Sequence, residues 1–223
     1  MPTEQNTNLP EPTFKGKHSI SMRLWHWSTV LTISGSLLTV LLAKTLLNTK
    51  ANVALVQDNL QKNNITITSD QAKAVAHDFN DLAWTWHIYF GYVLAALFGF
   101  RLLFEFFQPK NQKVIPLLKN GLRYLKQTGI NKKTGQHYIF VRFTYVVLYI
   151  VLGLQAITGL FMVYSDDVES LKVWRHNAKD VHNVLMWVII SYIVIHLGGV
   201  VMAELSKKYK GIVSQMINGG EEN

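Results

Sequence analysis

The sequence predicts an all-α integral membrane protein, built as a bundle of four transmembrane helices with both termini in the cytoplasm. Three observations lead to this fold class. Hydrophobic residues make up 49% of the 223 residues and charged residues only 16%, a balance that is unusual for a soluble domain. Four apolar segments reach the roughly 20 residues that a helix needs to cross a hydrocarbon core of about 30 Å. The basic residues concentrate in alternate connections between these segments.

The four apolar segments define the predicted spans. We expect a single membrane domain over residues 1–223, with a polar lead at 1–17. This lead is long, and the first apolar segment extends well beyond the apolar region of a signal peptide, so the first span is expected to remain as an anchor. The predicted spans, in order, are about 24–47, 82–107, 138–164 and 181–205.

The distribution of charge gives the orientation of the spans. The connection between the second and third spans carries seven lysines and arginines and no acidic residue, whereas the other two connections mix basic and acidic residues. By the positive-inside rule, this connection and both termini face the cytoplasm. The net charge of +8 is therefore a topological bias with anionic lipid as its partner, and not a nucleic-acid surface.

Two connections have recognisable local patterns. Residues 114–126 alternate apolar and basic side chains, which predicts a short amphipathic helix that either lies on the inner membrane surface or packs its leucines under the bundle. The outer connection at 48–81 is long and polar, with Ser69 as a candidate N-cap for the helix that enters the second span.

Four histidines fall on the predicted spans and are the main indication of function. His182 and His196 lie fourteen residues apart, close to four helical turns, so they share one helix face about 21 Å apart. With the N-terminus inside, His87 and His182 both lie at the outer level. His26 and His196 share the inner level, with His196 somewhat deeper. Ionisable residues at membrane depth usually serve a function. Two pairs of histidines, each at one depth, therefore predict two ligand sites.

Paired histidines at these levels predict two haems, each held between helices by two axial imidazoles. The chain has no cysteine, which excludes disulfides, iron–sulfur clusters, thiolate zinc sites and covalently attached c-type haem. Arg23 and Arg142 are candidate contacts for haem propionates, with lipid phosphates as the competing partners. Of the other histidines, His77 and His176 lie near the outer level and are alternative outer ligands.

Several motifs resemble the b-type cytochrome subunit of membrane-bound nickel–iron hydrogenases and the wider bacterial cytochrome b561 group, which includes the formate dehydrogenase gamma subunit. They are Arg-Leu-Trp-His-Trp at 23–27, the histidine that opens the second span, Val-His-Asn-Val-Leu-Met-Trp…Ile-His-Leu at 181–197, and the tail at 211–220. The resemblance implies a four-helix bundle with one or two b haems that carries electrons between a partner protein and quinone. It assigns His26 with His196 to the inner haem and His87 with His182 to the outer haem.

The sequence thus predicts a di-haem membrane cytochrome b between an outer redox partner, such as a hydrogenase, and the quinone pool. We expect an electron-transfer subunit of an oxidoreductase complex and no catalytic residues, since no nucleophile and base pair is evident. A stand-alone cytochrome b561-like quinone oxidoreductase is the alternative within this class. Two alternatives of other classes are a histidine-using metal or proton transporter and a structural membrane anchor. A transporter would require acidic residues at membrane depth, which the spans almost lack.

Overall fold

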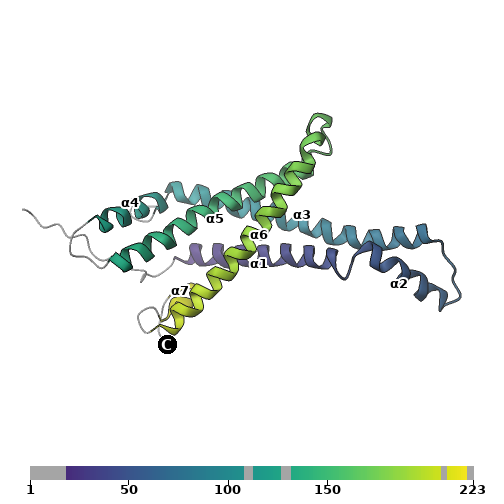
Figure 1. Ribbon diagram of the computed structural model, residues 1–223, viewed down its shortest axis with the longest axis horizontal. Helices are drawn as coiled ribbons and strands as arrows, with labels where there is room; N and C mark the ends of the chain where they lie inside the picture. Colours follow the sequence, from purple (N-terminus) through teal and green to yellow (C-terminus); the bar gives the residue numbers. More distant parts are fainter. Residues whose placement is uncertain (1–18, 108–112, 127–131, 207–209, 220–223) are drawn as a thin grey trace, which may run out of the picture. The chain divides into compact units, whose positions relative to one another are not determined.

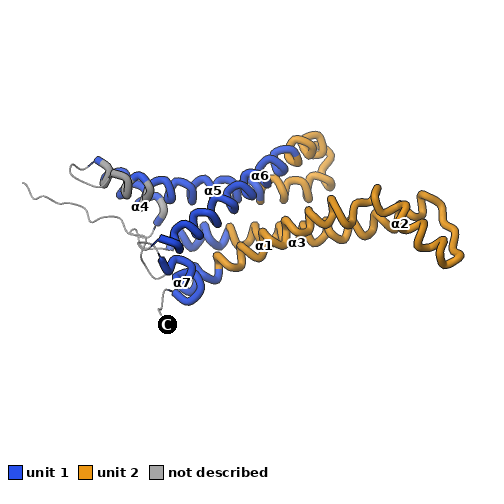
Figure 2. The backbone as a smooth tube through the Cα atoms, turned by 60° about the horizontal axis from the view of Figure 1, so that its bottom comes forward, with its two compact units in different colours: residues 1–24, 99–155, 180–223 blue, residues 25–98, 156–179 orange. Residues whose placement is uncertain are grey.

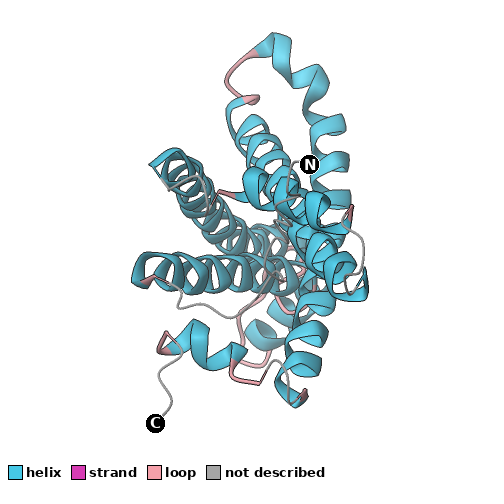
Figure 3. Cartoon of the chain, turned by 90° about the vertical axis from the view of Figure 1, so that its left-hand side faces the viewer, coloured by secondary structure: helices cyan, strands magenta, loops and turns pink. Residues whose placement is uncertain are grey.

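The computed structural model describes residues 19–107, 113–126, 132–206 and 210–219, and all regular secondary structure within them is α-helical (Figure 3). Four of the helices are long and apolar enough to cross a membrane, which confirms the predicted all-α fold with four spans. The helices are α1 (Ile20–Lys44), α2 (Thr49–Gln61), α3 (Ser69–Phe107), α4 (Val114–Leu125), α5 (Lys132–Tyr164), α6 (Glu169–Leu205) and α7 (Ile212–Ile217) (Figure 1).

Two of the membrane helices begin well before the apolar segments that predicted them. Helix α3 begins at Ser69 and α6 at Glu169, whereas the predicted spans begin at about 82 and 181. No glycine or proline interrupts either polar approach, so the helix continues beyond the part that the hydrocarbon thickness requires. The cap of α3 is Thr68, one residue before the predicted one. Its hydroxyl accepts from the backbone N–H of Gln71 (3.2 Å), and the Gln71 side chain accepts from the Thr68 N–H (2.9 Å), a capping box.

The chain forms two compact units, coloured separately in Figure 2. Unit 1 comprises residues 1–24, 99–155 and 180–223, and unit 2 comprises residues 25–98 and 156–179. Each of the four membrane helices passes from one unit into the other without interruption. Relations between residues of one helix are therefore fixed by helix geometry even where the unit changes.

In unit 2, helices α1 and α3 pack against each other in antiparallel orientation. At one end the indole N–H of Trp25 donates to the backbone carbonyl of Leu97 (2.9 Å). At the other end the Asn80 side-chain amide donates to the carbonyls of Ala43 and Leu47, both at 2.8 Å. The second contact satisfies the carbonyl of Ala43, in the last turn of α1, and that of Leu47, in the turn that follows the helix. Both contacts use a side chain and a backbone oxygen, so they fix the register of the two helices.

The close approach of α1 to α3 depends on Gly35. A Cβ atom added at this position would lie only 2.5 Å from Cζ of Phe90. Glycine at a helix contact in a membrane lets two backbones approach closely.

We expect the Gly35→Ala substitution to displace the Phe90 ring and destabilise the protein by about 1–3 kcal/mol, the usual cost of overpacking. The thermal unfolding midpoint of the purified protein should fall accordingly. Gly99→Ala is the matched control, because a Cβ there would meet no heavy atom within 4 Å. Equal midpoints for the two variants would show that the Gly35 contact does not limit packing.

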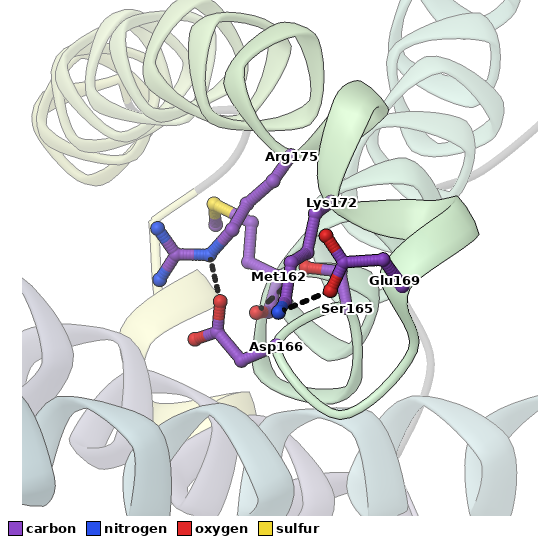
Figure 4. Close-up of polar contacts among 6 residues, drawn as sticks. All are labelled: Met162, Ser165, Asp166, Glu169, Lys172 and Arg175. Atoms are coloured by element: carbon purple, nitrogen blue, oxygen red, sulfur yellow. Dashed lines mark hydrogen bonds and ion pairs between the residues drawn. The ribbon is translucent and has the colours of Figure 1, made fainter.

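The turn between α5 and α6, also in unit 2, is held by local polar contacts (Figure 4). Ser165 is fully buried, and its hydroxyl donates to the carbonyl three residues earlier (3.1 Å). Arg175 Nε lies 3.0 Å from the Asp166 carboxylate and thereby ties the turn to the first turns of α6. A second, exposed ion pair joins Lys172 to Glu169 at 2.7 Å. These contacts give the long α6 helix a defined start.

The predicted amphipathic helix is present as α4 in unit 1. Ile115 and Leu122, seven residues apart and so on one face, are 64% and 48% exposed, and the basic residues Lys119 and Arg123 are exposed as well. Exposed apolar and basic side chains on one short helix are typical of helices that lie on a membrane surface. Lipid contact of α4 remains a prediction.

Candidate functional site

Each of the four predicted ligand histidines lies on a membrane helix, and each is half-buried. His26 belongs to α1, His87 to α3, and His182 and His196 to α6. Because α6 is one uninterrupted helix, the structure confirms that His182 and His196 share a helix, and four turns separate them by about 21 Å. His26 and His87 lie in unit 2, and His182 and His196 lie in unit 1. The pairing across helices therefore remains a prediction from depth.

The ring of His87 is oriented by α1. Its Nδ1 lies 3.3 Å from the carbonyl oxygen of Ser36, 3.2 Å from the Ser36 hydroxyl and 3.4 Å from the Thr39 hydroxyl. The Ser36 hydroxyl can donate or accept, but a carbonyl oxygen only accepts, so a hydrogen bond to the carbonyl requires the tautomer with the proton on Nδ1 and the lone pair on Nε2. Metal-binding histidines usually donate their other ring N–H to such an acceptor, which fixes the tautomer and the ring. The Ser36 carbonyl thus lies where it can accept from Nδ1 of His87 while Nε2 of the same ring binds a metal.

The ring of His182 contacts helix α5. Nε2 of His182 lies 2.9 Å from the side-chain amide nitrogen of Gln155. An amide nitrogen only donates, so Nε2 of His182 is the accepting nitrogen and holds a lone pair. The Gln155 amide thus occupies the lone pair through which His182 would bind a metal, so ligation through Nε2 requires this amide to turn away. Gln155 was missed in the sequence because a single glutamine in an apolar helix is equally consistent with an ordinary interhelical hydrogen bond.

The other two histidines contact aromatic rings on their own helices. Tyr192, one turn before His196, stacks on the imidazole with 5.9 Å between ring centroids and 6° between planes. Trp27 packs edge-on against His26 at 5.5 Å. Aromatic neighbours restrict the rotation of both imidazoles, and flat apolar surfaces suit a site that takes up a macrocycle.

Both predicted propionate-binding arginines have partners within unit 1. Arg23 Nη1 donates to the carbonyl of Ile217 in the C-terminal segment (2.8 Å). The guanidinium of Arg142 lies over the ring of Tyr145, with 5.8 Å to its centroid. The contact of Arg23 with the C-terminal segment joins positions almost two hundred residues apart, so no local pattern in the sequence predicts it.

The alternative outer ligands are in polar surroundings. His77 Nδ1 pairs with the Asp81 carboxylate at 2.8 Å, and both side chains are more than half exposed. His176 is exposed on the first part of α6. Neither has the half-buried position that His87 and His182 share, and the assignment of His87 and His182 as the outer ligands stays a prediction.

The donor set fits haem b. At His87 the contact with the Ser36 carbonyl suits a neutral imidazole with its lone pair on Nε2, the form that ligates haem iron, and at His182 the Nε2 lone pair becomes available when the Gln155 amide turns away. Within the described part of the chain, no group of three or more histidine, cysteine, aspartate or glutamate side chains gathers around a common point. Axial ligation of haem needs only two imidazoles, because the porphyrin supplies the other four nitrogens.

Comparison with known proteins identifies one family. The model of the family described as prokaryotic cytochrome b561 matches residues 17–219, which is nearly the whole chain and includes all four histidines. No curated protein and no solved structure gives a match.

Proposed function

Because the chain belongs to the prokaryotic cytochrome b561 family, we propose that it is a di-haem cytochrome that carries electrons between a redox partner and the quinone pool. Membership already makes it a multi-pass cytochrome b of the bacterial inner membrane with a role in electron transfer. We further propose that the chain binds two haems, that two histidines hold each haem, and that a partner protein and quinone exchange electrons with it.

The placement of His182 and His196 on one uninterrupted helix carries the proposal. One helix then supplies an axial ligand at each of two levels, and α1 and α3 supply the opposite ligands. In this assignment His196 and His26 bind the inner haem, and His182 and His87 bind the outer haem. The hydrogen bond from His87 to the Ser36 carbonyl supports the outer site, since it holds the imidazole in the ligating tautomer.

Two axial imidazoles suit electron transfer better than catalysis. When bound, haem b would supply a one-electron couple at each level, and two histidines holding each iron would leave it no position for a substrate. The histidines hold the iron, and the apolar helices exclude water from it. Arg23 and Arg142 remain our candidates for charge-assisted hydrogen bonds to the propionates.

We place the electron donor on the outer face and quinone near the inner level. The tail at 211–220 supports a hydrogenase as the donor, because it resembles the hydrogenase-type branch. A stand-alone b561-like quinone oxidoreductase is the alternative. Identification of the protein that co-purifies with the chain from its native membrane distinguishes them.

Visible spectroscopy of the purified full-length protein tests the proposal. We expect reduced b-type absorption bands that titrate as two components, and reoxidation of both when a soluble quinone analogue is added. A protein that stays colourless after expression with ample haem would exclude the function. One titrating component would exclude the di-haem assignment while leaving a cytochrome.

A further inference from the structure

The C-terminal segment Gly211–Gly219 is anchored at both ends by charged side chains from membrane helices of unit 1. At its start, the Glu204 carboxylate of α6 accepts from the backbone N–H groups of Gly211 (3.1 and 3.2 Å) and Val213 (3.3 Å). At its end, Arg23 of α1 donates to the backbone carbonyl of Ile217 (2.8 Å), and Ile217 is the last residue of α7. The segment therefore links the end of α6 to the start of α1.

Two glycines allow this link. Gly211 and Gly219 have φ angles of 94° and 87°, in the left-handed region that other residues rarely adopt. A Cβ added at Gly219 would lie 3.5 Å from Cζ of Arg23, so this glycine also packs directly against the guanidinium. The segment is thus shaped around the Arg23 side chain.

The contact with Ile217 uses only part of the guanidinium. Nε of Arg23 is buried, and it donates to no described residue. A buried N–H without an acceptor is costly, the more so on a charged group, so an acceptor beyond the described residues is expected. Arg23 lies three residues before His26 on α1, a spacing that places both side chains on one helix face.

We infer that the C-terminal segment is a positioning element of the inner haem site. It holds Arg23 through Nη1 so that Nε donates to an oxyanion, which we assign to an inner haem propionate. A lipid phosphate offers the same chemistry and is the alternative source. This inference rests on the proposed function, because it requires a haem at the inner level. Arg23 and the segment position the haem and tune its potential, and neither reacts.

The direction of the effect follows from charge. A guanidinium near the haem disfavours the ferric form, which carries one more positive charge than the ferrous form. Loss of Arg23, or release of its side chain when the segment is removed, should therefore lower the midpoint potential. We expect the ratio of reduced to oxidised inner haem to fall about tenfold at a fixed potential, which for a one-electron couple is about 59 mV.

Redox titration of four proteins tests the inference: wild type, Arg23→Gln, a truncation that ends at Lys210, and the two changes combined. We expect all four to bind both haems. Each single change should lower the inner potential, and the combination should lower it no further, because the segment acts through Arg23. Arg23→Lys keeps the positive charge, so its inner midpoint potential should lie between those of Arg23→Gln and wild type. Arg123→Gln, which removes an exposed arginine of α4, is the matched control and should change nothing.

Two further measurements identify the acceptor and the contact. With haem whose propionates are esterified, the difference in inner potential between wild type and Arg23→Gln should change, because Nε then loses its anionic acceptor while the guanidinium charge stays. A difference that esterification leaves unaltered, or that vanishes when lipid is removed, would assign the acceptor to lipid and overturn the inference. Hydrogen exchange at residues 212–217 should increase in Arg23→Gln even without haem.

Failure of the inference differs from failure of the proposed function. Additive shifts, or a truncation that leaves the inner potential unchanged while both haems stay bound, would overturn the role of the segment and leave the cytochrome intact. A wild-type protein without haem would instead overturn the proposed function itself.

Discussion

Replacing His182 by alanine should remove one haem and leave the other in place, and replacing His196 should do the reverse. Each imidazole supplies one of the two axial bonds of a single haem in our assignment, and alanine offers the iron no donor atom. The two sites lie four helical turns apart, so neither substitution reaches the other site directly. The effect is close to complete loss of one haem per polypeptide, the largest that we expect.

Haem content measured against polypeptide, together with a redox titration, checks this prediction. The remaining component should keep a midpoint potential near its value in the wild-type protein. His176→Ala is the matched control, since His176 is an exposed histidine of the same helix. Loss of both haems in each variant, with the helical content unchanged, would contradict two independent sites. Retention of both haems in His182→Ala would assign the outer ligand to another residue.

The sequence predicts the number of membrane helices more securely than their ends. Hydrophobic length fixes the four spans, because the bilayer thickness sets a minimum for each. It does not fix the starts of α3 and α6, which extend through polar residues outside the hydrocarbon. These starts depend on local capping instead, such as the box formed by Thr68 and Gln71. Helix α2 was not predicted either, because its short polar sequence has no marked periodicity.

For the candidate site, the sequence supplies ligands but not their supporting contacts. Helical periodicity is enough to place His182 and His196 on one face. The acceptor for His87 is a backbone carbonyl, that of Ser36, and every residue of a helix carries one. The contact therefore depends on the register of α1 against α3, which residue types do not encode locally. The same limit applies to Arg23 and Ile217, which only the folded chain brings together.

The second large effect that we expect concerns a buried ion pair in unit 1. Arg101 of α3 is only 5% exposed, and its Nη1 lies 3.0 Å from the carboxylate of Glu105 one turn later. Its guanidinium also lies over the Tyr149 ring of α5, 5.5 Å from the centroid. Glu105→Ala should leave the arginine charge buried without its counter-ion and destabilise the protein by about 3–5 kcal/mol. We expect a destabilisation near the lower end of this range, because 27% of the Glu105 side chain is exposed and water can reach part of the site.

The two single substitutions of this pair should differ. A carboxylate can take up a proton and become neutral, whereas a guanidinium stays charged, so Arg101→Leu should cost less than Glu105→Ala. Replacing both residues by leucine should recover most of the stability, since a buried apolar pair needs no counter-ion. Thermal unfolding in detergent measures all three variants. Glu169→Ala, which breaks an exposed pair of similar spacing, should have little effect. If the double leucine variant is no more stable than Glu105→Ala, the pair stabilises the contact between α3 and α5 through its geometry, and the unpaired charge is not the cause.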